Sequence, residues 1–261
     1  MATVRDLCKK AKDSYVQGDY KAAFDTLHTA MEKDPDDYKV KMGLAFCLMR
    51  LGEYDLAIEI FDQLISTEHS NIKPIYQKGL CYLQLNKFQE AIDCFDMIIK
   101  DFKKDKRIYH KKGFCLYQLQ RYSEALDCFE IAAKSDINAY FSAMYYGLCS
   151  FWLDNQGDGL LILKKLCEKY PIEKSEQYYV IHYETSLCLF VVGENEKAIA
   201  IYDELLKKDF EIKTVNYLKG LCLQYMKKYE EAIACFEIIE ENDTDYEAAK
   251  NCIAECKAEL M

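Results

Sequence analysis

Apolar residues recur at helical spacing in one segment of the chain after another. Such runs are Tyr54, Ala57, Phe61 and Leu64, then Phe88, Ala91, Phe95 and Ile98, and later Tyr229, Ala232, Phe236 and Ile239. Side chains three or four residues apart share one face of an α-helix. Each run therefore predicts an amphipathic helix whose apolar stripe packs inward.

A small residue recurs in a neighbouring helix, mostly at intervals of 34 residues. The series is Ala11, Ala45, Gly79, Gly113 and Gly147, and it continues at Ser186 and Gly220. A second series follows twelve residues later, at Ala23, Ala57, Ala91, Ala125, Gly159, Ala198 and Ala232. Two small positions per unit indicate two closely packed helices. A fixed period of this length is typical of a solenoid, whose units bury a core only by stacking.

One unit of this pattern resembles the tetratricopeptide repeat family. Residues 76–95 contain that family's small residue, aromatic turn residue, alanine and second aromatic residue in order, and the resemblance covers essentially the whole chain. It implies an all-α, right-handed superhelix of seven helical hairpins at about 4–37, 38–71, 72–105, 106–139, 140–173, 179–212 and 213–246. Residues 247–261 are predicted to form a capping helix, with an apolar stripe at Tyr246, Ala249, Ile253, Cys256 and Leu260.

Glycines mark the short turns between paired helices, at Gly18, Gly52 and Gly193. Glycine adopts the positive φ that ends many helices, so these turns predict antiparallel hairpins. The fifth unit is irregular, because its turn runs through residues 154–159 and five extra residues, 174–178, follow it. The irregularity indicates either a hinge or a simple loop insertion on a rigid solenoid.

The composition is that of a folded protein, with 51% hydrophobic and 30% charged residues. We expect a cytoplasmic protein without membrane insertion, because the sequence has no apolar run of membrane-spanning length and no secretory signal at its start. The net charge of −10 argues against a general affinity for nucleic acid, which requires a basic surface.

Most of the thirteen cysteines follow the repeat. Six lie two residues after the small position, and three precede the aromatic residue of the second helix: Cys47, Cys81, Cys115, Cys149, Cys188 and Cys222, and Cys94, Cys128 and Cys235. Neighbouring equivalent helices lie about 8–10 Å apart, whereas a disulfide needs Cα atoms within roughly 7 Å. We predict buried, reduced thiols. Cys252 and Cys256 have helical spacing but no histidine nearby, so no metal site is predicted.

The sequence also lacks the motifs of an enzyme. Its four histidines, His28, His69, His110 and His182, lie in different units, and no glycine-rich phosphate loop follows a strand. We therefore predict a non-enzymatic protein with no catalytic residue and no cofactor.

The resemblance implies that the first helix of each unit lines a concave groove. Residues six and three before the small position, and one and four after it, would point into this groove. Those three before the small position, and those one and four after it, are apolar or aromatic nearly throughout. The predicted groove residues are Met42, Phe46, Met49, Tyr76, Leu80, Leu83, His110, Phe114, Tyr117, Met144, Leu148, Phe151, Trp152, Tyr183, Leu187, Phe190, Tyr217 and Leu221. Soluble monomers rarely expose so long an apolar strip, so we expect a segment of another protein to cover it.

The outermost groove position changes character along the chain. It is Arg5, Lys39, Lys73 and Arg107 in the first four units, and Phe141, Val180 and Thr214 in the last three. Such a basic edge would suit acidic residues that flank an apolar ligand segment. A solvated series of cations left by repeat duplication is the other interpretation.

The favoured function is a protein-binding scaffold, as a subunit of a multiprotein complex, and two alternatives stay open. Some members of the resembled family act as co-chaperone adaptors that hold acidic C-terminal peptides through Lys and Asn pairs. Here Lys12, Gly43 and neighbouring apolar residues such as Phe46 lie where the asparagines would be. Lys73 is the only obvious match to the Lys and Asn pattern. In the other alternative, the groove closes against a second copy in a homodimer.

Overall fold

The computed structural model describes residues 2–67, 71–101, 105–134, 139–153 and 155–261. Within these ranges the chain is helical and contains no strand. The helices are α1 (Val4–Val16), α2 (Tyr20–Lys33), α3 (Tyr38–Leu51), α4 (Tyr54–Thr67), α5 (Ile72–Gln84), α6 (Phe88–Asp101), α7 (Lys106–Gln118), α8 (Tyr122–Ala133), α9 (Ala139–Trp152), α10 (Gln156–Lys169), the 3₁₀ helix η1 (Glu176–Tyr178), α11 (Tyr179–Val191), α12 (Asn195–Leu206), α13 (Ile212–Tyr225), α14 (Tyr229–Phe236) and α15 (Tyr246–Glu259).

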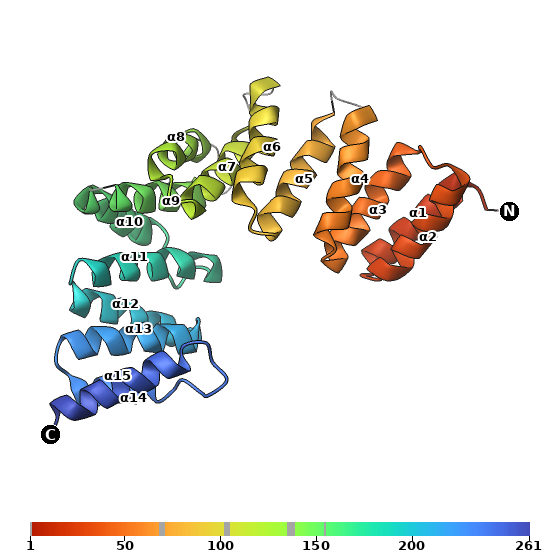
Figure 1. The fold of residues 1–261 in the computed structure, drawn as a ribbon. Coiled ribbons are helices and arrows are strands. Elements are labelled where there is room, and N and C mark those ends of the chain that lie inside the picture. The colour runs from red at the N-terminus through yellow and green to blue at the C-terminus, as the bar shows by residue number, and fades with distance from the viewer. Residues whose placement is uncertain (1, 68–70, 102–104, 135–138, 154) are drawn as a thin grey trace. The chain divides into compact units, whose positions relative to one another are not determined.

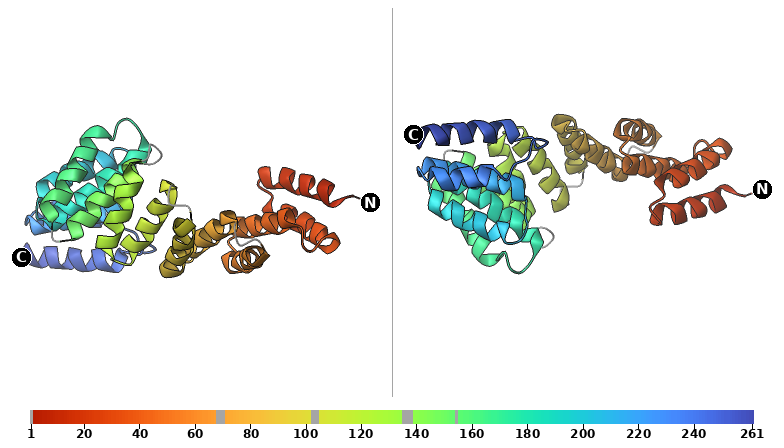
Figure 2. Two further views of the ribbon diagram at one scale, coloured as in Figure 1. Left: turned by 90° about the horizontal axis from the view of Figure 1, so that it is seen from above. Right: turned by 90° about the horizontal axis from the view of Figure 1, so that it is seen from below.

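The chain folds as two compact units, Met1–Ile137 and Asn138–Met261. The first unit holds α1–α8 and the second holds α9–α15 (Figures 1 and 2). Within each unit, consecutive helices pack as hairpins and each hairpin stacks on the next one. This is the repeating all-α arrangement that the 34-residue period predicts.

The small residue of each first helix faces one large side chain sixteen residues further along. A Cβ atom built on Gly79 would lie 2.9 Å from Cε1 of Phe95, and one built on Gly220 would lie 2.6 Å from Cε1 of Phe236. Carbon atoms that are not bonded pack best at about 3.5–4.0 Å. The close approach of the paired helices therefore depends on the missing side chain at these positions.

The turns inside the hairpins share one left-handed residue, seven positions after the small residue. As predicted, φ is positive at Gly18 (+85°), Gly52 (+83°) and Gly193 (+79°). The same conformation occurs where the residue is not glycine, at Asn86 (+55°), Gln120 (+58°) and Lys227 (+61°). The packing of the hairpin therefore imposes the left-handed turn whether or not a glycine is present.

Side-chain caps fix where the first helices of the first unit begin. The caps are Thr3, Asp37, Asn71 and Asp105. The carboxylate of Asp37, for example, accepts the backbone N–H of Val40 at 3.0 Å. Each cap satisfies a backbone donor that has no partner inside the helix. The residues of the predicted basic edge lie two positions after these caps, in the first turn.

The cysteines that follow the small position pack against the preceding hairpin. Cys47 of α3 shares a core cluster with Ala23 and Leu27 of α2, and Cys81 of α5 shares another with Phe61 of α4. All nine cysteines of the two repeating series are buried, which confirms the predicted burial, while their reduced state stays a prediction. Thiols suit these places because they act as small apolar groups.

Helix α15 continues the register of the first helices. Cys256 stands 34 residues after Cys222 and is fully buried in a core cluster with Phe236 of α14. On α15, Lys250 and Lys257 are exposed where the second helix of a further hairpin would pack. The helix thus packs as half of a repeat with a polar outer face, the arrangement that keeps the end of a solenoid soluble. Leu260, placed in the apolar stripe by the sequence, is 50% exposed.

One of the five extra residues before α11, Tyr178, belongs to an aromatic cluster of the second unit. The ring centroid of Tyr178 lies 5.6 Å from that of Tyr140 and 5.1 Å from that of Tyr170. Nε2 of His182 lies 3.0 Å from the carbonyl oxygen of Tyr170. These contacts favour a packed loop over a hinge at the insertion. Asp154, in the irregular turn of the fifth unit, lies outside the described residues.

Candidate protein-interaction surfaces

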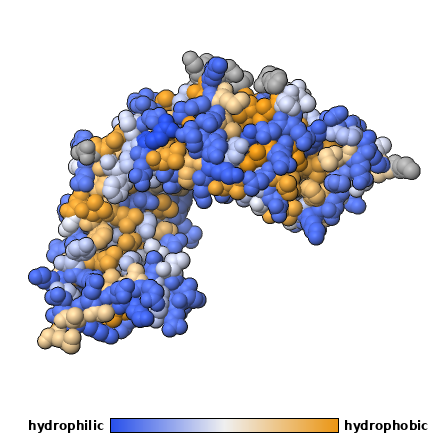
Figure 3. All heavy atoms as spheres, in the orientation of Figure 1, coloured by the Kyte–Doolittle hydropathy of each residue, from blue (hydrophilic) through white to orange (hydrophobic). Residues whose placement is uncertain are grey.

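Helices α3, α5 and α7 carry the predicted groove residues of the first unit. Eight of these nine residues, all except Met42, are partly buried and partly accessible: Phe46, Met49, Tyr76, Leu80, Leu83, His110, Phe114 and Tyr117. Figure 3 shows apolar side chains gathered over α3–α5. We call these eight residues the apolar band.

Contacts with the second helices fix the rings of the apolar band. The ring centroid of Tyr76 lies 6.2 Å from that of Phe95, and that of His110 lies 5.8 Å from that of Phe129. Burial disfavours the charged imidazole and lowers the pKa of His110 to about 4, so this side chain is neutral at pH 7. The band therefore offers ordered apolar surface with little charge.

Helix α9 differs from the prediction. Met144, Leu148 and Phe151 are 0%, 1% and 1% exposed, and Met42 in α3 is 4% exposed. The expectation that these four side chains face a groove is wrong. The ring of Trp152, which is 42% exposed, lies 5.1 Å from the Phe151 ring and helps to cover it. Because α9 has no charged residue, its sequence pattern could not separate a core face from an accessible one.

The remaining groove residues of the second unit lie on α11 and α13. Tyr183, Leu187, Phe190, Tyr217 and Leu221 are half-buried, and Figure 3 shows apolar side chains over these two helices. The sequence interpretation missed one neighbour, Tyr225, which is 72% exposed with its ring centroid 5.7 Å from that of Phe190. Tyr217 and Leu221 also pack beside α15, so α15 covers part of this face.

The four residues of the basic edge are exposed in the first turns of α1, α3, α5 and α7. Arg107 donates from Nε and Nη2 to the carboxylate of Asp105, at 3.0 and 2.8 Å, and this pairing lowers the pKa of Asp105. Nζ of Lys73 lies 5.5 Å from the ring centroid of Phe46. Arg5, Lys39 and Lys73 form no ion pair within the described ranges. Arg107 is therefore the least available cation of the four.

An apolar cavity between α1, α2 and α3 was missed from the sequence. It has a volume of about 220 Å³ and is lined by Cys8, Ala11, Lys12, Tyr15, Leu27, Lys39, Gly43, Phe46 and Cys47. Gly43 was the available signal, because the equivalent position of every other repeat carries a larger residue. We call this cavity the α1–α3 pocket.

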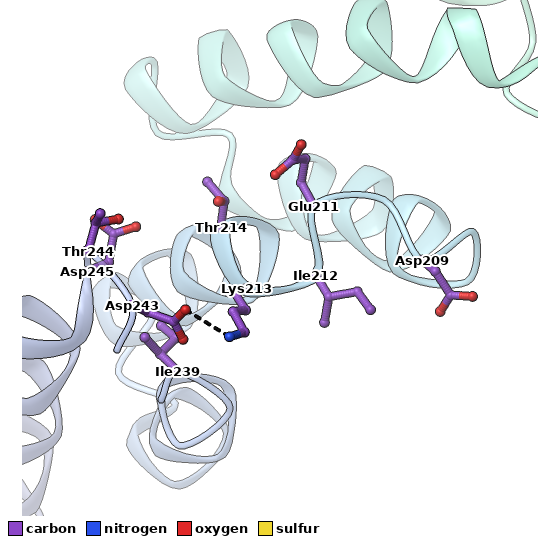
Figure 4. A pocket seen from close by; sticks show the side chains of 9 residues that line it. All are labelled: Asp209, Glu211, Ile212, Lys213, Thr214, Ile239, Asp243, Thr244 and Asp245. Atoms are coloured by element: carbon purple, nitrogen blue, oxygen red, sulfur yellow. Dashed lines mark hydrogen bonds and ion pairs between the residues drawn. The ribbon is translucent and has the colours of Figure 1, made fainter. Parts of the chain in front are cut away.

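A second, acidic hollow of about 420 Å³ lies between the start of α13 and the loop before α15 (Figure 4). Asp209, Glu211, Asp243 and Asp245 line it, and Nζ of Lys213 lies 2.8 Å from Oδ1 of Asp243. Across the described part of the chain, no three His, Cys, Asp or Glu side chains are arranged to hold a metal ion. The described helices also include none that is long and apolar enough to cross a membrane.

These features define the class of protein. The chain is an all-α repeat protein whose first helices present partly accessible apolar side chains in each unit. Three family models, each of the tetratricopeptide repeat, match residues 16–78, 76–140 and 214–237. The chain belongs to the tetratricopeptide repeat family.

Solved structures share this fold. A tetratricopeptide repeat protein from Parabacteroides merdae matches with a TM-score of 0.80 and 18% sequence identity, over 97% of this chain and 98% of that one. MamA from Desulfovibrio magneticus RS-1, from residue 41 to its end, matches with a TM-score of 0.61 and 16% identity, over 66% and 97%. Another MamA structure matches with a TM-score of 0.59 and 18% identity, over 67% of this chain and 94% of that one. A search of curated proteins gives no match. At these identities the likeness concerns the fold.

Proposed function

We propose that this chain is a non-enzymatic scaffold that binds an apolar or amphipathic segment of a partner protein on the first helices of its repeats. The apolar band on α3, α5 and α7 is the observation that carries the proposal. Its side chains retain apolar surface that a ligand would remove from water, at about 25 cal/mol per Å². Repeats of this family support a role in protein interaction in general.

The composition of the band suits a protein ligand. Aromatic residues such as Phe114 and Tyr117 anchor interfaces because they bury much area with few rotatable bonds. Met49 adds a flexible side chain that adapts to the shape of a ligand. We further propose that the chain acts in the cytoplasm as a subunit of a larger complex, since its buried thiols suit a reducing compartment.

The test compares two pairs of substitutions in the first unit. Leu80→Ala with Phe114→Ala truncates the apolar band, whereas Leu56→Ala with Met97→Ala truncates side chains on the second helices that are 48% and 52% exposed. Partners captured from source cells are identified, and their affinity for both variants is measured. We expect the band variant to bind at least thirtyfold more weakly, because loss of a central anchor commonly costs about 2 kcal/mol. The second-helix variant should bind normally.

Circular dichroism checks that both variants keep their helices. Loss of binding in the second-helix variant alone would place the interface on the other face of the hairpins. If the band variant instead turns a dimer into a monomer in sedimentation, the apolar band serves self-association. Either result would replace the proposed function.

A further inference from the structure

The α1–α3 pocket is sized for one side chain. Its volume of about 220 Å³ lies below the roughly 300–1,000 Å³ typical of small-molecule sites. Ala11, Leu27 and Gly43 contribute to its wall, and Phe46 closes one side. An apolar cavity of this kind favours an aliphatic group over a polar ligand.

The pocket exists because three residues are smaller than most of their equivalents in the other repeats. Cys8 occupies the position of Met42, Tyr76, His110, Met144, Tyr183 and Tyr217. Leu27 occupies the position of Phe61, Phe95, Phe129, Leu163, Tyr202 and Phe236. Gly43 occupies the position of Lys9, Gln77, Lys111, Tyr145, Glu184 and Leu218. The first two hairpins therefore leave open a space that larger side chains occupy in other repeats.

Two lysines line the pocket and a third lies beside one of its lining residues. Lys12 and Lys39 line it, and Lys73 lies over the ring of Phe46. None of the three forms an ion pair within the described ranges. Lys12 is also an exception within the repeat, because the same position is Phe46, Leu80, Phe114, Leu148, Leu187 and Leu221 in the other units. Exposed cations beside an apolar cavity are complementary to carboxylates beside an apolar side chain.

The distribution of charge along the chain also favours the first unit as the site for an acidic ligand. Residues 1–137 contain 21 Lys and Arg against 22 Asp and Glu, a net charge of −1. The remaining −9 of the total −10 belongs to residues 138–261. An acidic ligand meets far less repulsion on the first unit than on the second.

We propose that the α1–α3 pocket takes one leucine or methionine side chain from an internal segment of a partner protein, and that Asp or Glu residues on both sides of it meet Lys12, Lys39 and Lys73. This inference rests on the proposed function and assigns it a site and a ligand chemistry. We assign an internal segment and not a free chain end, because the asparagines by which members of the family hold a terminal carboxylate are replaced here by Lys12 and Gly43.

The experiment measures fluorescence anisotropy of a labelled peptide, Gly-Ser-Asp-Glu-Leu-Glu-Asp-Ser-Gly, with its C-terminus amidated. It uses the full chain at 50 mM salt. We expect saturable binding that weakens at least fivefold at 300 mM salt, because exposed charges are screened. Replacing the peptide's leucine with alanine should weaken binding about tenfold. Exchanging its acidic residues for lysine should abolish binding.

Variants of the protein locate the site. Cys8→Tyr introduces the residue that three other repeats carry at this position, and it should weaken peptide binding at least tenfold by filling the pocket. Leu27→Phe, which also copies other repeats, fills the same pocket from α2. It is the second test variant if Cys8→Tyr unfolds. Lys12→Glu with Lys39→Glu should abolish peptide binding. The control, Lys10→Glu with Lys21→Glu, makes the same charge change at exposed positions outside the pocket and should keep most of the peptide binding.

Normal peptide binding by folded Cys8→Tyr and Leu27→Phe variants would overturn the proposal. Binding that requires a free C-terminal carboxylate would overturn it as well, in favour of recognition of a chain end. Absence of any peptide binding, with partner capture still dependent on Leu80 and Phe114, would refute this pocket and leave the proposed function standing.

Discussion

Nζ of Lys78 in α5 lies 2.5 Å from Oδ1 of Asp62 in α4, so an ion pair joins two consecutive hairpins. The same spacing of sixteen residues recurs in Lys112–Asp96, at 2.5 Å, and in Lys219–Asp203, at 2.6 Å. Each lysine side chain is only 19–22% exposed. The pairs therefore help to fix how one hairpin stacks on the next within each unit.

A double-mutant cycle on Lys112→Met and Asp96→Ala should give a coupling energy of about 0.5–1.5 kcal/mol from urea denaturation. The part-buried lysine keeps more of the attraction than an exposed one, and 1 M salt should reduce the coupling. The control is Lys134–Glu130, whose side chains are 65% and 60% exposed. Its coupling should stay below about 0.5 kcal/mol. Equal couplings for both pairs would show that partial burial does not strengthen the recurring pair.

Gln120→Gly and Lys227→Gly should each stabilise the protein by about 0.5–1 kcal/mol. Both residues are exposed and adopt a left-handed backbone, which glycine tolerates better than other residues. Thermal denaturation measures the gain. Glu59→Gly, in the exposed middle of α4, should destabilise by about 1 kcal/mol and serves as the opposite control. A loss of stability on Gln120→Gly would mean that the native side chain makes a contact worth more than the strain.

The fold was predictable because its signals are local and repeated. Gly79 and Phe95, or Gly220 and Phe236, encode the close approach of two helices at a fixed separation in the sequence. The turn was only partly predictable, since Gln120 and Lys227 adopt the glycine conformation without being glycine. There the packing of the hairpin overrides the preference of the residue.

The candidate site was less predictable, because exposure depends on what packs over a helix. Phe151 matches the groove pattern, yet the ring of Trp152 lies against it and it is buried. Arg107 matches the basic edge, yet Asp105 pairs with it. The α1–α3 pocket arises because Cys8, Leu27 and Gly43 are small. A pattern of apolar residues gives no information about the volume that small residues leave empty.

Tyr202→Phe should stabilise the second unit by about 1 kcal/mol. The Tyr202 side chain is fully buried, and within the described residues its hydroxyl lies beside that of Ser186 but makes no hydrogen bond of good geometry. A buried polar group without a partner costs about 1–3 kcal/mol, and phenylalanine removes it with little change of shape. Urea denaturation measures the effect, with Tyr225→Phe at a 72% exposed site as the control. Destabilisation by Tyr202→Phe would reveal a bonded hydroxyl.

A thiol reagent at pH 8 should label at most three cysteines of the native protein rapidly. Cys8, Cys167 and Cys252 are half-buried, whereas the other ten are buried. Burial raises the pKa of Cys81 and Cys222 to about 12, so little reactive thiolate forms. All thirteen should react in guanidinium. Rapid native labelling of more than three thiols would contradict the burial of the other ten cysteines, and Cys252→Ser should lower the number of rapidly labelled thiols by one.

His110→Tyr should make the first unit less sensitive to acid. Burial, with a smaller effect of nearby Lys111, lowers the pKa of His110 from 6.5 to about 4 in the folded chain. Between these two pH values the unfolded chain binds the proton and the folded chain does not, so acidification through this window destabilises the fold. The loss is at most about 3 kcal/mol and is absent above pH 7.

Tyrosine is the matched replacement, because Tyr76 and Tyr217 occupy the same position in other repeats and pack on the same aromatic neighbour. The measurement is the free energy of unfolding of both proteins in urea at pH 7, 5.5 and 4.5. Carboxylates titrate in both proteins alike, so the difference between the two isolates the imidazole. We expect this difference to grow in favour of the tyrosine variant as the pH falls. Parallel pH profiles would show instead that the imidazole of His110 is protonated as easily in the folded chain as in the unfolded one.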